Sequence, residues 1–174
     1  MNHDRAFIAY HEAGHAVADI VFEHDLGAVT IEPDGERAGG VEINRPDDDD
    51  LRYQDATASQ VKFERRIMSS MAGEIAQRRF DPASVDPDHA AGDRVFAADY
   101  FDELDTPTDE IFRAYHHLLT LRTEYLVEKY WPHIQRVAIR LLDYGTLTAD
   151  EARDAFVDPL AFAGMAATNG TSHG

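Results

Sequence analysis

Apolar residues recur at helical spacing along two long segments of the chain, and these segments predict its main helices. The first helix is expected over about residues 4–24, where Phe7, Ala13 and Val17 fall on one face before Leu26-Gly27 ends it. The second is expected over residues 56–80. Its apolar stripe consists of Val61, Ile67, Met68, Met71, Ala72, Ile75 and Ala76.

Further helices are predicted in the second half of the chain. One should begin near Asp88 or Gly92, and another should cover residues 107–130 with Thr106 as its N-cap. The first of these has a short run of apolar residues. They are Val95, Phe96, Ala98 and Phe101.

The last part of the pattern has clear breaks. Trp131-Pro132 predicts a break in the helix, after which the apolar positions continue to a stop at Gly145. Thr148 and Glu151 then stand three residues apart, which is the spacing of a capping box, so a final helix should begin there.

Only two short segments have the character of strands. Residues 29–31 predict one strand, which Pro33-Asp34-Gly35 ends in a turn, and residues 38–46 predict a second. The acidic run Asp47-Asp48-Asp49-Asp50 is expected to be a solvated loop. The sequence therefore predicts a mainly α fold with a small β element.

Composition narrows the range of partners. The chain has 174 residues, enough for one domain, and 33 acidic against 16 basic residues give it a formal charge of −17. Such a charge argues against nucleic acid or an anionic membrane as the main partner. The absence of cysteine excludes disulfides and thiolate ligands, and no apolar run is long enough for a membrane span. We expect a cytoplasmic protein.

The stretch His11-Glu12-Ala13-Gly14-His15 carries the candidate chemistry. On a helix, His11 and His15 leave the same face and can bind one Zn²⁺ ion together. Glu12 can then lie beside a water at the metal, take its proton and pass it to a leaving amine, as in a metallopeptidase. The alternative is two histidines on a polar helix face with a solvated glutamate between them.

A zinc site of this kind needs a third protein ligand. Spacing alone does not choose it. The candidates are Glu64, Glu74, Asp86, Asp88, His89, Asp93 and Asp99.

The chain resembles the zinc peptidase domain of the FtsH-type AAA+ proteases, in blocks that follow the family's order. The first block, Tyr10-His11-Glu12-Ala13-Gly14-His15-Ala16, is similar to the family's Tyr-His-Glu-Ala-Gly-His-Ala stretch. Further similar blocks lie at residues 29–35, 38–46, 71–76, 91–97 and 141–148. The resemblance implies a helical zinc peptidase fold with a small β element beside the site.

The resemblance also selects site residues. It implies that Asp93 is the third zinc ligand. His89 is the runner-up, because it is a histidine one turn earlier. It places Gly39, Gly40 and Val41 in an edge strand, to which an extended peptide substrate could add through main-chain hydrogen bonds. Full-length relatives assemble as rings, so a homo-oligomer remains open for this chain.

The chain departs from the family at several points. Glu74 and Gln77 stand where the family has arginine and glutamate, which puts the family's supporting contacts in question. The sequence also lacks the glycine-rich phosphate-binding loop with its lysine, so it offers no ATPase module. The Met1 start favours a stand-alone relative over a fragment of a larger protein.

The sequence thus predicts a zinc endopeptidase over residues 1–160, with residues 161–174 as a flexible tail. Without an unfolding motor, it should cut unfolded or flexible protein segments independently of ATP. Two other hypotheses stay open: a catalytically silent binding or scaffolding module with structural zinc, and a zinc hydrolase that acts on a non-peptide amide. Metal should be lost below about pH 6, as the histidines protonate.

Overall fold

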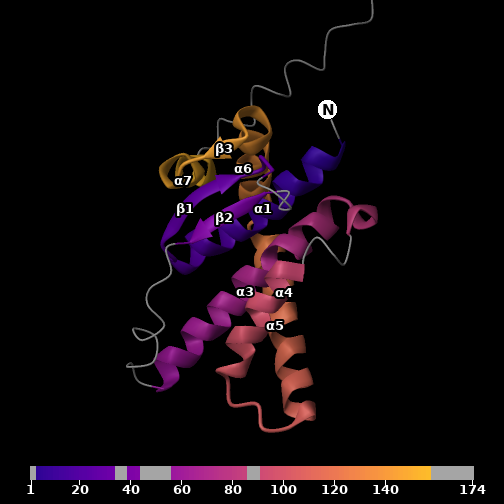
Figure 1. Ribbon diagram of the computed structural model, residues 1–174, viewed down its shortest axis with the longest axis vertical. Coiled ribbons are helices and arrows are strands. Elements are labelled where there is room, and N and C mark those ends of the chain that lie inside the picture. The colour runs from indigo at the N-terminus through magenta and orange to yellow at the C-terminus, as the bar shows by residue number, and fades with distance from the viewer. Residues whose placement is uncertain (1–2, 34–38, 44–55, 86–90, 158–174) are drawn as a thin grey trace, which may run out of the picture.

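The computed structural model describes residues 3–33, 39–43, 56–85 and 91–157 of the chain. Six α-helices dominate these residues, so the mainly α prediction is confirmed. They are α1 (His3–Phe22), α3 (Ala56–Phe80), α4 (Ala91–Asp102), α5 (Asp109–Lys129), α6 (Trp131–Tyr144) and α7 (Ala149–Val157) (Figure 1). A 3₁₀ turn, η1 (Pro82–Ser84), follows α3.

A three-stranded antiparallel sheet provides the β element. Its strands are β1 (Leu26–Thr30), β2 (Gly40–Ile43) and β3 (Thr146–Leu147), in the order β2-β1-β3. Val29 of the central strand is opposite Val41 on one side and Leu147 on the other. Both β2 and β3 are therefore edges of this sheet, and Gly40 and Val41 lie on an edge strand as expected.

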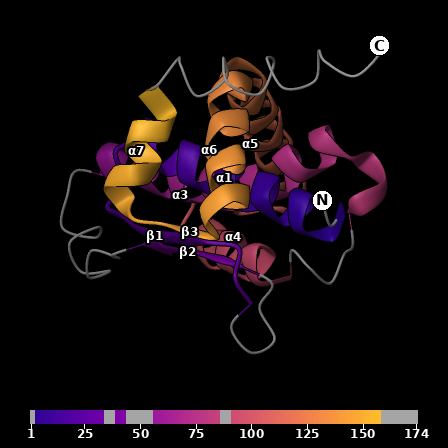
Figure 2. The same ribbon diagram turned by 90° about the horizontal axis from the view of Figure 1, so that it is seen from above.

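Helix α1 forms the centre of the core. It packs against α3, α6 and β1, and Figure 2 shows it running through the middle of the molecule with the sheet along one side. Ala9, Ala13 and Val17 on α1 are fully buried. Gly14 lies at a close approach of α1 to α3, because a Cβ there would lie 2.6 Å from the carbonyl oxygen of Ala72. The glycine thus serves helix packing.

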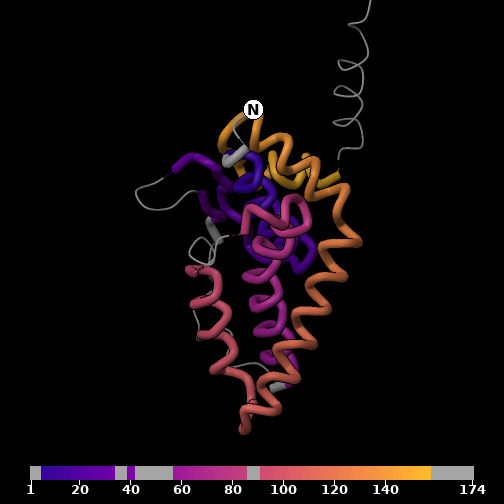
Figure 3. Tube along the Cα trace, turned by 90° about the vertical axis from the view of Figure 1, so that its right-hand side faces the viewer, coloured from indigo at the N-terminus to yellow at the C-terminus, as the bar shows by residue number. Residues whose placement is uncertain are grey.

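Helices α3, α4 and α5 extend together away from the end of the molecule that holds the sheet (Figure 3). Two apolar predictions on these helices are wrong. Val61 on α3 is 41% exposed and Val95 on α4 is 62% exposed. Helix α4 turns a different face to α3, and that face buries Ala97 and Phe101, four residues apart.

Most predicted helix ends agree with the structure. The predicted bounds of α3 are those observed, α6 begins at Trp131, and Gly145 ends α6 with a positive φ of 79°. The capping box is confirmed, because the backbone N–H of Thr148 donates to Glu151 Oε2 at 2.8 Å and the Thr148 hydroxyl accepts from the backbone N–H of Glu151 at 3.3 Å.

Two boundaries and one strand differ from the prediction. The N-cap of α5 is Thr108 rather than Thr106, since the Thr108 hydroxyl accepts from the backbone N–H of Ile111 at 3.2 Å. Leu26 does not end a helix but begins β1, opposite Ile43. Strand β3 was not predicted, because its two residues carry no periodic signal of their own.

Several predictions fall outside the described residues. They include the turn at Asp34-Gly35, the acidic run at residues 47–50 and the tail at residues 161–174. Within the part of the chain that the structure describes, no helix combines the length and the apolarity needed to cross a membrane.

Candidate metal centre

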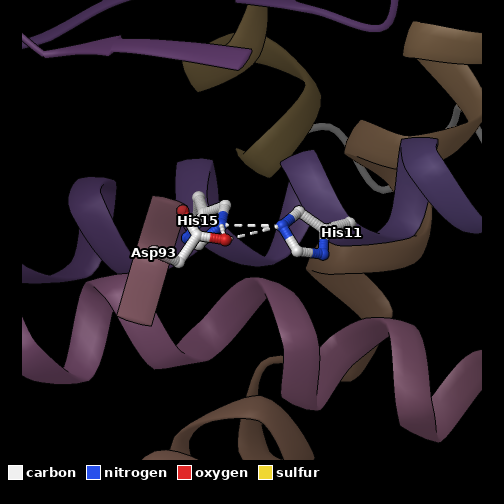
Figure 4. A group of neighbouring side chains, drawn as sticks. All are labelled: His11, His15 and Asp93. Atoms are coloured by element: carbon white, nitrogen blue, oxygen red, sulfur yellow. Dashed lines mark hydrogen bonds and ion pairs between the residues drawn. The ribbon is translucent and has the colours of Figure 1, made fainter. Parts of the chain in front are cut away.

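Two elements bring the three predicted ligands together. His11 and His15 lie four residues apart on α1, and Asp93 lies in the first turn of α4 (Figure 4). The two Nε2 atoms are 3.1 Å apart, and Asp93 Oδ2 is 3.0 Å from that of His11 and 3.3 Å from that of His15. Asp93 points inward because it lies one turn before Ala97, on the buried face of α4.

His11 is oriented by a buried amide. Its Nδ1 lies 2.9 Å from Gln77 Oε1, and the Nε2 of the same glutamine donates to the carbonyl of Ser84 at 2.8 Å. Since the Ser84 carbonyl can only accept, the amide oxygen must face the imidazole. Nδ1 of His11 therefore carries the hydrogen, which leaves Nε2 with a free lone pair.

His15 is oriented by the backbone of α3. Its Nδ1 donates to the carbonyl of Ser69 at 2.8 Å, so its Nε2 also faces the centre of the group. The ring lies against Gly73, where any side chain would collide with its Nε2. A histidine whose second nitrogen donates to a carbonyl or amide oxygen is the usual arrangement around a bound metal.

The arrangement fits a zinc ion. Around a tetrahedral ion with bonds of about 2.0–2.1 Å, neighbouring ligand atoms lie about 3.3 Å apart. The three separations here, 3.0–3.3 Å, are close to that value. Two imidazole nitrogens and a carboxylate oxygen are also ligands that zinc prefers. These three residues form a group that could hold a metal ion.

Mutual electrostatics shift the pKa values of His15 and Asp93 in the metal-free protein. Burial acts to lower the pKa of His15, but the charge and hydrogen bond of Asp93 outweigh it and raise this pKa to about 10. Burial acts to raise the pKa of Asp93, but the two histidines hold it well below its usual range. In the metal-free protein, protonated His15 thus supplies the positive charge that balances the Asp93 carboxylate.

Glu12 lies beside this group in a buried position. It is 7% exposed, and burial raises its pKa against the opposing effect of His11 and His15. Gly39 packs directly on it, since a Cβ at Gly39 would lie 3.0 Å from Glu12 Oε1 and 2.8 Å from the carbonyl oxygen of Thr30. The residue before β2 is therefore in contact with the glutamate of the motif.

The other ligand candidates are engaged elsewhere or lie outside the described residues. Glu64 accepts from Tyr115 and Arg122, and Glu74 pairs with Arg94 at 2.9 Å. Asp99 is exposed on α4. The remaining three are Asp86, Asp88 and His89, which the structure does not describe.

Comparison with known proteins identifies the N-terminal half of the chain. The sequence model of the family described as Peptidase family M41 matches residues 1–86. Residues 1–86 are thus similar to peptidase family M41, the FtsH peptidase family. The M41 match supports a function of the metallopeptidase type. No curated protein matches the chain.

The M41 region contains much of the candidate centre but not all of it. Residues 1–86 include His11, Glu12, His15 and Gln77, whereas Asp93 lies beyond the match. M41 peptidases depend on zinc in general, which agrees with the donor set found here.

Sequence reasoning missed the residues that support the ligands. Ser69 acts through a backbone carbonyl, which leaves no trace in the sequence. Asp19 hydrogen-bonds to the Ser69 side chain, and its position four residues after His15 could have pointed to it. Gln77 was noted only as a departure from the family pattern.

Proposed function

We propose that this chain is a zinc-dependent endopeptidase. His11, His15 and Asp93 bind the ion, and Glu12 is the general base and then the general acid. The observation that carries the proposal is the triangle of two imidazole nitrogens and one carboxylate oxygen, 3.0–3.3 Å apart, with both Nδ1 atoms bonded away from it. Both Nε2 atoms thus face one point, where each can offer its lone pair to an ion once His15 has lost its proton.

Glu12 handles the proton in this proposal. When bound, the zinc ion supplies the charge that acidifies a water and polarises the scissile carbonyl. A carboxylate oxygen of Glu12 would take a proton from that water as the water oxygen bonds to the scissile carbonyl carbon. Glu12 would then deliver the proton to the amine nitrogen as the C–N bond breaks. Its burial, which raises its pKa, favours the protonated form that the second step needs.

Strand β2 is the proposed substrate platform. It is an edge of the sheet, and Gly39, the residue before it, lies against Glu12. An extended peptide that pairs with Gly39–Val41 through its main chain would lie beside the general base. Such pairing depends little on side chains, so we propose unfolded or flexible protein segments as substrates, cut without ATP in the cytoplasm.

Zinc content and cleavage test the proposal together. Untagged wild-type protein should contain about one zinc per chain by elemental analysis and should hydrolyse fluorescein-labelled casein. Asp93→Ala should lose the zinc, whereas Asp99→Ala, an exposed residue of the same helix, should keep it. Glu12→Gln should keep the zinc and lose about 10²- to 10⁴-fold in cleavage rate.

Each alternative outcome has a distinct meaning. A wild-type protein that takes up no zinc at neutral pH would contradict the metal site. Full zinc occupancy without cleavage of casein would favour the silent binding or scaffolding module. Undiminished cleavage by Glu12→Gln would refute the proposed role of the glutamate.

A further inference from the structure

Three polar contacts cross the interface between α1 and α3 at regular intervals. His11, His15 and Asp19 lie on one face of α1, and each faces a residue of α3. His11 faces the Gln77 side chain, and His15 faces the carbonyl of Ser69 and packs against Gly73. Asp19 faces the Ser69 side chain, so the partners run in the opposite order along α3. The first two contacts orient the proposed zinc ligands.

The third contact is the one that the proposed mechanism leaves unused. Asp19 is fully buried, and its Oδ1 accepts from the hydroxyl of Ser69 at 2.6 Å. The same oxygen lies 2.7 Å from Nδ1 of His24, just beyond the C-terminal end of α1. Among the described residues, no donor reaches its Oδ2. A buried carboxylate with one oxygen unpaired is costly, so its presence calls for a role.

Ser69 joins this contact to the metal centre. Its hydroxyl donates to Asp19, and its carbonyl accepts from Nδ1 of His15. Both groups of one residue are therefore held by α1, at positions one helical turn apart. The hydrogen bond from Ser69 to Asp19 therefore ties α1 to α3 at the same residue whose carbonyl orients the His15 ring.

We propose that Asp19 and Ser69 are positioning residues of the metal centre. Asp19 holds Ser69, and Ser69 aims the Nε2 of His15 at the ion. His24, through the same Asp19 oxygen, holds the carboxylate from the other side, and its backbone N–H donates to the carbonyl of Asp19 at 2.9 Å. The inference rests on the proposed function, since it assumes that His15 binds zinc.

Metal affinity measured in matched variants tests the inference. Ser69→Ala removes the hydroxyl but keeps the carbonyl, and the neighbouring Ser70→Ala is the control. We expect Ser69→Ala to weaken zinc binding about tenfold in a chelator competition, at the low end of the effect of losing a direct partner of a metal ligand, because the carbonyl that accepts from His15 remains. Ser70→Ala should remain within about twofold of wild type.

Two further readouts separate positioning from a merely structural role. The visible absorption of bound Co²⁺ should change in Ser69→Ala, because the His15 ligand is displaced, and should be unchanged in Ser70→Ala. Asp19→Asn keeps an oxygen that can accept from Ser69, so it should bind zinc more tightly than Asp19→Ala. If Asp19→Ala does not fold, Ser69→Ala still decides the matter.

The outcomes distinguish this inference from the proposed function. If wild type binds zinc and Ser69→Ala binds it equally well with the same Co²⁺ spectrum, the inference is wrong even where Ser69→Ala melts at a lower temperature. The zinc site itself would then stand. If wild type binds no zinc, the proposed function fails first, and the inference fails with it.

Discussion

Gly39 lies at a point where no side chain would fit. A Cβ there would come within 3.0 Å of Glu12 Oε1 and 2.8 Å of the Thr30 carbonyl oxygen, whereas a Cβ at Gly40 would meet nothing within 4 Å. The two adjacent glycines thus form a matched pair. The first is required by its contact with Glu12, and the second is free of steric demand.

Alanine substitution at each glycine should therefore have opposite results. Gly39→Ala should displace the Glu12 carboxylate and lower the rate of casein cleavage by tenfold or more, because the general base must lie within hydrogen-bond reach of the proton that it takes. Zinc content should not change. Gly40→Ala should cleave casein within about twofold of wild type. Equal activity of the two variants would contradict the contact between Gly39 and Glu12 as a determinant of catalysis.

The residues of the site differ in how well the sequence alone predicts their roles. His11, Glu12 and His15 could be chosen from spacing alone, because a helix puts the two imidazoles on one face. Asp93 could not, since 77 residues separate it from His15 and only the resemblance singled it out. The role of Ser69 could not be predicted from the sequence, because it orients His15 with a backbone carbonyl, which every residue has.

At the scale of elements, most boundaries that neighbouring residues determine were predicted, although the N-cap of α5 is Thr108 and not Thr106. The bounds of α3, the break at Trp131 and the capping box at Thr148 depend on neighbouring residues, and all were predicted. Strand β3 depends on β1, more than a hundred residues earlier, and was missed. The exposure of Val95 depends on which face α4 turns to α3, which its own sequence does not reveal.

Strand β2 carries the prediction that belongs to this scale. Val41→Pro removes a backbone N–H from the edge strand and fixes its φ, so main-chain pairing with a substrate should weaken. We expect the KM for a peptide substrate to rise at least fivefold, with zinc content unchanged. Val41→Ala keeps the N–H and should leave KM within about twofold of wild type. A proline variant that cleaves peptide as well as wild type does would rule out β2 as the platform.

At the scale of the whole molecule, the metal centre links stability to pH. In the metal-free protein, the pKa of His15 is raised from 6.5 to about 10. Its contribution to stability is therefore complete below pH 6.5 and is lost as the pH rises through 10. The pKa of Asp93 is lowered from 3.8, so its contribution is present above pH 3.8 and is lost as the pH falls below that value. This pair is thus most stabilising between about pH 4 and pH 6.5.

Bound zinc should oppose the loss of stability that the metal-free protein shows as the pH rises above 6.5. The ion needs the Nε2 lone pair of His15, which the proton occupies below pH 10. The apparent zinc affinity should therefore rise by up to about tenfold for each unit that the pH is raised toward 10. In scanning calorimetry, the Tm of the metal-free protein should fall between pH 6.5 and 8.5, while the increase in Tm on adding zinc should grow. Asp93→Asn should lose most of the fall, because the carboxylate that raises the pKa of His15 is gone. A metal-free Tm that rises over this range in wild type would mean that His15 and Asp93 do not share a proton, and that the centre is not held together as its geometry indicates.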